Sequence, residues 1–256
     1  MIEFENLNSA YYKTDDCLIY HGDCLEVMRI LPNRFIDMIL CDLPYGITAC
    51  KWDKKIPFEP LWEQYKRIIK DNGVIVLTAS QPFTSALVMS NIKMFKYEWV
   101  WDKVKGTGFQ IAKFRPMVRT ESCLVFGKRK VKYNPQKIKL DKPKVDSLAS
   151  TKSGSSPIAY LNKGKKLVID RHPTNIIQFK RDTNRIHPTQ KPVALFEYLI
   201  KTYTNESDIV LDNCMGSGTT GVACRNLNRK FIGIEISKDY VDMSIKRITN
   251  TEKLLV

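Results

Sequence analysis

The chain has 256 residues, of which 43% are hydrophobic, so one large domain or two small ones can fold around a core without disulfide bonds. Its seven cysteines include no CxxC pair, no apolar run is long enough to cross a membrane, and no secretory signal is recognisable, which together predict no metal site, no membrane partner and a cytoplasmic location. The formal charge is +14, and the segment 128–181 supplies a net +12 of it.

The first half of the chain alternates strand-like and helix-like segments. A helix is predicted at Phe58–Lys70 from the spacing of its apolar residues. Buried strands are predicted at Cys17–His21, Ile36–Cys41, Val74–Ala79 (after an Asp71-Asn72-Gly73 turn), Glu98–Trp101 and Ser122–Phe126. This alternation predicts an α/β fold with a mostly parallel sheet that helices cover on both faces.

A polar turn follows the strand predicted at Ile36–Cys41. It reads Asp42-Leu43-Pro44-Tyr45, and these residue types suit a planar base that carries an amino group. The Asp42 carboxylate and the Leu43 carbonyl can accept the amino protons, Pro44 fixes the turn, and the Tyr45 ring offers a stacking surface. Two acceptors would free the nitrogen lone pair for attack on an electrophilic methyl group. Taken alone, the turn is equally compatible with an ordinary strand end.

The segment 128–182 differs in character from what precedes it. It contains four prolines and a Ser-Gly-Ser-Ser run but no long periodic apolar stretch, so we interpret it as a loop-rich insertion. Its charge suits a polyanion-binding surface, and a solvated, lysine-rich loop is an equal alternative. The predicted DNA-binding residues are Lys128, Arg129, Lys130, Lys163, Lys165, Lys166, Arg171, Lys180 and Arg181.

After the insertion the α/β pattern resumes. Helices are predicted at Val193–Thr202, Thr219–Leu227 and Lys238–Ile248, and strands at Ile209–Leu211 and Phe231–Ile236. The first of these strands leads through Asp212 into the glycine-rich turn Gly216-Ser217-Gly218. An acid, Glu235, follows Gly216 by 19 residues, close to the spacing expected of a carboxylate that binds ribose hydroxyls. An adenosine cofactor is favoured over a glycine turn used only for packing.

Five segments, taken in order, resemble the amino-group DNA methyltransferases with the β order of motifs. Asp42 to Tyr45 is similar to the family's Asp-Pro-Pro-Tyr signature, and Asp212 to Thr220 to its cofactor loop. The other three are Tyr20 to Cys24, a strand with Arg119 to Glu121 and Leu124 to Phe126, and His187 to Pro192. The resemblance implies a Rossmann-like sheet with one antiparallel strand and a circularly permuted motif order. It also implies a catalytic domain of residues 1–127 and 183–256 around a target-recognition insertion, 128–182.

The resemblance implies S-adenosylmethionine as cofactor and double-stranded DNA as partner. Asp23 and Cys24 would hold the cofactor's adenine, Glu235 its ribose, and the catalytic turn a base flipped out of the duplex. The methionine carboxylate would lie among Lys191, Ser217, Thr219 and Thr220. The remaining implied cofactor residues are Asp42, His187, Thr189, Asp212, Met215, Gly216 and Gly218. Members of this family are bacterial, archaeal or phage-encoded and often belong to restriction-modification systems. A homodimer is a possible oligomeric state.

The sequence departs from the family pattern at two places. Leu43 replaces the first proline of the catalytic signature, and Asn213-Cys214 replaces Pro-Phe in the cofactor loop. Asp42 favours adenine N6 as the target, because relatives that methylate cytosine N4 often have serine at that position. Cytosine N4, an RNA or small-molecule amine, and a catalytically inert DNA-binding relative are the alternatives.

Overall fold

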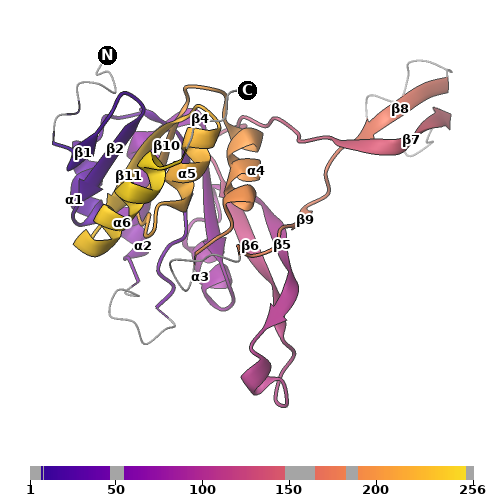
Figure 1. Ribbon diagram of the computed structural model, residues 1–256, viewed down its shortest axis with the longest axis horizontal. Coiled ribbons are helices and arrows are strands. Elements are labelled where there is room, and N and C mark those ends of the chain that lie inside the picture. The colour runs from indigo at the N-terminus through magenta and orange to yellow at the C-terminus, as the bar shows by residue number, and fades with distance from the viewer. Residues whose placement is uncertain (1–6, 8, 47–54, 148–164, 183–189, 252–256) are drawn as a thin grey trace. The chain divides into compact units, whose positions relative to one another are not determined.

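The computed structural model describes residues 7, 9–46, 55–147, 165–182 and 190–251. Two compact units divide the chain: residues 1–134 with 175–256, and residues 135–174. The first unit is built on a nine-stranded sheet (Figure 1). Its strands are β1 (Tyr12–Lys13), β2 (Cys17–His21), β3 (Ile36–Cys41), β4 (Ile69–Ala79), β5 (Phe95–Thr107), β6 (Val118–Phe126), β9 (Ile176–Gln178), β10 (Ile209–Asp212) and β11 (Lys230–Glu235).

The strand order is β1-β2-β11-β10-β3-β4-β6-β5-β9. From β2 to β4 every pairing is parallel, and β6 runs against β4, as the predicted antiparallel strand should. The two-residue β1 is antiparallel as well. The order reverses between β3 and β10, which pair through Met38–Val210 and Ile39–Leu211. Open α/β sheets bind ligands at such a reversal, beyond the carboxyl ends of the strands.

Helices cover both faces of this sheet. One face packs against α1 (Cys24–Ile30), α2 (Phe58–Ile68) and α3 (Phe83–Ser90). The opposite face packs against α4 (Val193–Tyr203), α5 (Thr219–Asn226) and α6 (Lys238–Thr249). Because both faces are covered, a strand such as β3 is buried at every position, which explains its continuous apolar sequence.

The predicted turn at Asp71-Asn72-Gly73 is wrong, because β4 starts at Ile69 and continues through it. The pairing with β3 shifts register between Ile36 and Met38, so the glycine marks a bulge. A Cβ on Gly73 would lie 2.9 Å from the carbonyl oxygen of Asp37, which leaves room only for glycine.

The segment 128–182 is more regular than its composition indicates. β7 (Ile138–Ser147) and β8 (Lys165–Arg171) pair antiparallel within the second compact unit, and β9 joins the main sheet beside β5. The inserted unit is therefore 135–174, shorter at both ends than 128–182. Lysines interleaved with apolar residues concealed these strands, although charged residues are common on two-stranded ribbons with exposed edges.

No helix among the described residues is both long and apolar enough to cross a membrane.

Candidate active site

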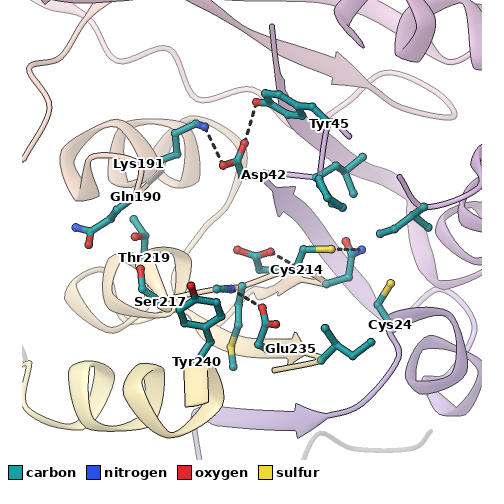
Figure 2. A pocket seen from close by; sticks show the side chains of 18 of the residues that line it. Cys24, Asp42, Tyr45, Gln190, Lys191, Cys214, Ser217, Thr219, Glu235 and Tyr240 are labelled. Atoms are coloured by element: carbon teal, nitrogen blue, oxygen red, sulfur yellow. Dashed lines mark hydrogen bonds and ion pairs between the residues drawn. The ribbon is translucent and has the colours of Figure 1, made fainter. Parts of the chain in front are cut away.

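A cavity of about 740 Å³ opens at the carboxyl ends of β3, β10 and β11, within the size range of small-molecule sites. Residues from both predicted motifs line it, although the motifs are far apart in the chain. Figure 2 shows Lys191 and Tyr45 pointing toward Asp42, with Glu235 and Ser217 lining another part of the cavity. The lining includes Asp23, Cys24, Asp42, Leu43, Pro44, Tyr45, Lys191, Asp212, Met215, Gly216, Ser217, Thr219 and Glu235.

The Asp42 carboxylate is held by three donors. Its Oδ1 accepts hydrogen bonds from the Tyr45 hydroxyl at 2.9 Å and from the Thr78 hydroxyl. Its Oδ2 accepts one from Lys191 Nζ at 2.8 Å. An ionised carboxylate has about four acceptor positions, so one remains for a further donor. The turn after β3 therefore presents a fixed carboxylate acceptor to the cavity.

Lys191 and Glu121 form a buried ion network behind Asp42. Lys191 Nζ lies 3.4 Å from Glu121 Oε2, while Glu121 Oε1 lies 3.1 Å from Lys103 and 3.5 Å from Arg181. Burial alone would lower the pKa of Lys191, but Asp42, Tyr45 and Glu121 raise it well above its usual value. Burial would likewise raise the pKa of Glu121, but Lys191 and Lys103 lower it. Both groups are thus charged at neutral pH.

The Tyr45 ring is supported on one face. It stacks on Phe83 with ring centroids 5.0 Å apart and an interplanar angle of 24°. Phe83 begins α3 and is buried, so it fixes the orientation of the tyrosine. Burial and the neighbouring Asp42 raise the pKa of Tyr45 well above its usual value, which keeps its hydroxyl a donor.

Glu235 joins the end of β11 to the glycine-rich turn. Its Oε2 accepts a hydrogen bond from Gly216 N and its Oε1 one from Ser237 N, each at 2.9 Å. Gly216 has φ +49°, and a Cβ added to it would have no atom within 4 Å. The backbone at Gly216 therefore borders open space in which a ligand can lie.

Gly218 and Thr220 are not among the residues that line the cavity. Gly218 is the N-cap that precedes α5 and has φ +77°; a Cβ there would lie 2.8 Å from the side chain of Ser244, so this glycine serves packing. The Thr220 hydroxyl donates to Asp212 Oδ2, and Cys214 N donates to Asp212 Oδ1. Burial raises the pKa of Asp212 to about 7.

The two departures in the cofactor loop have partners in the structure. Asn213 Oδ1 accepts a 2.6 Å hydrogen bond from the hydroxyl of Tyr65, and both side chains are buried. Cys214 interacts with the thiols of Cys24 and Cys41. A hydrogen bond to α2 therefore fixes the loop where the family has proline, and a thiol beside two other thiols stands where the family has phenylalanine.

Asp23 serves both the cavity and the start of α1. Its Oδ1 accepts hydrogen bonds from Leu25 N at 2.8 Å and Glu26 N at 3.2 Å, which caps the helix. The neighbouring Cys24 is buried and also lines the cavity. Two other predicted cofactor residues, His187 and Thr189, lie outside the described residues.

The predicted DNA-binding residues are scattered. Lys128 contacts the Ile69 carbonyl and Asp71 at the amino end of β4, which is the sheet edge opposite the cavity. Arg129 and Lys130 follow Lys128 and are exposed. Arg181 lines the cavity beside Glu121, and Lys180 is the residue before Arg181. Arg171 ends β8 and is exposed. Lys163 lies outside the described residues, and for Lys165 and Lys166 only the backbone is described.

Several residues of the site escaped the sequence analysis. Thr78 and Glu121 reach Asp42 and Lys191 from the neighbouring strands β4 and β6. Arg247, on α6, donates from Nη1 to the Ser217 carbonyl and the Thr219 hydroxyl, both at 3.0 Å. Glu121 was noted only as part of a strand, and neither Thr78 nor Arg247 has a local signal, because their partners are distant in sequence.

A family model described as DNA methylase matches residues 36–246. The DNA adenine methyltransferase YhdJ of Escherichia coli (strain K12) is 30% identical over 249 residues, covering 90% of this chain and 82% of the relative. The type II methyltransferase M.HpaI of Haemophilus parainfluenzae is 27% identical over 249 residues, covering 89% and 72%.

Two solved structures share the fold of this chain. The crystal structure of the M1.HpyAVI–SAM complex superposes with a TM-score of 0.63 at 30% identity, covering 90% of this chain and 99% of that one. The PvuII DNA methyltransferase, described as cytosine-N4-specific, has a TM-score of 0.67 at 18% identity and covers 96% of each chain, which supports the fold alone.

Proposed function

Since the chain belongs to the DNA methylase family of amino-directed, S-adenosylmethionine-dependent enzymes, we propose that its target is N6 of adenine in double-stranded DNA. The observation that supports the proposal most is the set of contacts around Asp42. Three donors hold its carboxylate and one acceptor position is left toward the cavity. An exocyclic amino group supplies the donor that this position requires.

The cavity suits the cofactor on its own geometry. Its volume of about 740 Å³ suits a nucleoside-sized ligand, and the backbone at Gly216 can be approached without a Cβ in the way. We assign Glu235 to the ribose hydroxyls, Asp23 and Cys24 to the adenine, and Ser217 with Thr219 to the methionine carboxylate. When bound, S-adenosylmethionine supplies an electrophilic methyl group on a sulfonium centre.

The catalytic turn prepares the amino group for attack. One amino proton is donated to Asp42 and the other to the Leu43 carbonyl, which localises the nitrogen lone pair. We assign the Tyr45 ring, which stacks on Phe83, to stacking on the flipped base. Lys191 Nζ lies 2.8 Å from Asp42 Oδ2 and 3.4 Å from Glu121 Oε2, so it holds the Asp42 carboxylate in place for the amino group. Asp42 is also placed to receive the proton that the methylated nitrogen releases.

Two features favour adenine over cytosine. The first catalytic position is Asp42, and a relative 30% identical to this chain is named a DNA adenine methyltransferase. Purified protein should therefore convert plasmid DNA to a product that contains N6-methyladenine, measured by mass spectrometry of the digested nucleosides. N4-methylcytosine in the digest would refute the choice of base and leave the amino-group mechanism intact. An Asp42→Ala preparation serves as the blank.

We also assign DNA contacts to the basic insertion. The net +12 of residues 128–181 predicts that log K for DNA falls by about 0.9 per phosphate neutralised as log salt rises. Replacing Lys163, Lys165 and Lys166 with alanine should lower that slope by up to about 2.7. The matched control replaces Lys66, Lys93 and Lys96, which are exposed and lie outside the insertion. Equal slopes for the two triple variants would contradict a DNA-facing insertion.

A further inference from the structure

The connection between β5 and β6 is an exposed arm, defined here as residues 104–118. Figure 1 shows both strands continuing as a hairpin that ends in a short 3-10 turn, Phe109–Ile111. Every residue from 109 to 120 is exposed. Phe109 and Phe114 are 81% and 87% exposed, and Ile111, Met117 and Val118 accompany them. Two phenylalanines this exposed on one tip indicate a contact surface.

The pairing register places the arm at the catalytic edge of the sheet. Ala79, the last residue of β4, pairs with Ser122, and Trp101 pairs with Glu121, which lines the cavity. β6 is antiparallel to β4, so the residues before Glu121 extend beyond that edge. Five residues of extended chain reach on the order of 16 Å. The arm thus rises beside the opening into which a flipped base must pass.

The arm is basic as well as apolar. Its exposed cations are Lys105, Lys113 and Arg115, and Arg119 follows on β6. The sequence has no Asp or Glu between Asp102 and Glu121. Cations around an aromatic tip complement a ligand that offers both anionic groups and stacked rings. DNA offers both, whereas a purely apolar protein groove would complement the phenylalanines of the arm but not its cations.

The base of the arm is fixed. Arg119 donates to both oxygens of Asp102, at 2.6 Å and 2.7 Å, and Gln178 on β9 donates to the same carboxylate at 3.1 Å. Val104 N donates to Asp102 Oδ1 at 2.8 Å. At the tip, Phe114 N donates to the Ile111 carbonyl at 3.0 Å. The two rings are therefore presented on an ordered support, which lowers the entropic cost of inserting them.

We propose that this arm enters the DNA, with Phe109 and Phe114 packing against bases next to the flipped target while Lys113 and Arg115 contact phosphates. The inference rests on DNA as the substrate of the proposed function. Flipping a base leaves its neighbours unstacked, and an apolar side chain inserted there recovers part of the lost stacking. The arm would thus stabilise the extruded state, in addition to any contacts made by the insertion.

The test compares three variants on a duplex with 2-aminopurine at the target. The double variant Phe109→Ala/Phe114→Ala should bind DNA about 5- to 100-fold more weakly, measured by fluorescence anisotropy. It should also lose most of the 2-aminopurine signal of flipping at saturating protein. Phe109→Trp/Phe114→Trp keeps the stacking surface and should retain both properties. The control Met89→Ala removes a side chain that is 71% exposed on α3 and should change neither.

A fourth variant separates charge from stacking. Lys113→Ala/Arg115→Ala should lower the salt slope of DNA binding by about 1.8 while leaving the flipping signal at saturation intact. Calorimetry with S-adenosylhomocysteine should give wild-type affinity for every arm variant, which shows that the cavity is unchanged. The readouts do not depend on which base is methylated, so the arm and the choice of adenine are tested separately.

The proposal is overturned if the alanine double variant binds and flips the target as the wild type does. It is equally overturned if sedimentation shows that the double variant dissociates a dimer while each chain keeps its DNA affinity. In that case the rings would belong to an interface with a second copy of this chain.

Discussion

Replacing Asp42 with alanine is expected to lower the rate of methyl transfer by at least about 10²–10³-fold, because it removes the acceptor that prepares the amino group. The variant should still bind S-adenosylhomocysteine and DNA, since Glu235, the glycine-rich turn and the basic surfaces are untouched. Single-turnover methylation of a labelled duplex measures the effect on chemistry apart from product release.

Asp42→Asn is the matched variant for this experiment. Its amide oxygen still accepts a hydrogen bond, so some activity should remain, although Lys191 loses the partner that lies 2.8 Å away. Circular dichroism and the thermal midpoint test whether either variant is simply unfolded. A wild-type rate for Asp42→Ala would show that the catalytic turn has been misassigned.

Replacing Glu235 with alanine should weaken cofactor binding by about 1.5–3 kcal/mol, which is roughly 10- to 150-fold in Kd. Two losses contribute: the charged acceptor for the ribose hydroxyls, and the hydrogen bonds at 2.9 Å that hold Gly216 N and Ser237 N. Calorimetry with S-adenosylhomocysteine measures the change, with one site per chain expected for the wild type.

Glu235→Gln distinguishes the two losses. It keeps one acceptor for Gly216 N but places an amide NH₂ where the second acceptor was, so an intermediate affinity is expected. Asp239→Ala, an exposed acid in the first turn of α6, is the control for a change of charge near the site. If Glu235→Ala bound the ligand with wild-type affinity, the cofactor would have to lie elsewhere in the cavity.

The sequence predicted those parts of the site that local patterns describe. The turn after β3 and the loop after β10 each have a recognisable signature, and the alternation of strands and helices implied that their carboxyl ends share one edge. What it could not give is the contacts between motifs. The family resemblance implies that Lys191 lies near the methionine carboxylate, whereas the structure pairs it with Asp42 and Glu121. The sequence likewise predicted only a stacking role for the Tyr45 ring, whereas in the structure the Tyr45 hydroxyl also donates to Asp42. Tyr45→Phe should therefore lose part of its activity.

The fold was predictable where burial is complete and less so where it is partial. β3 and β10 are buried throughout and were found at or within one residue of their bounds. The two-stranded β7–β8 ribbon was missed because lysines alternate with its apolar residues. The arm between β5 and β6 was missed because its strands continue past the covered part of the sheet, where no hydrophobic pattern marks them.

The position of β10 between β3 and β11 has a consequence for how the protein is made. Ile209 N donates to Asp37 across 172 residues of chain. Most of the chain is therefore synthesised before β10, the second neighbour of β3, can pair with it. Until then the nascent chain leaves one edge of β3 unpaired, and closing so long a loop makes folding slow. The catalytic turn is translated early, yet it gains a cofactor cavity only when β10 and β11 dock. An unfinished chain therefore lacks part of the cavity wall, and the step that completes the sheet also completes the cavity.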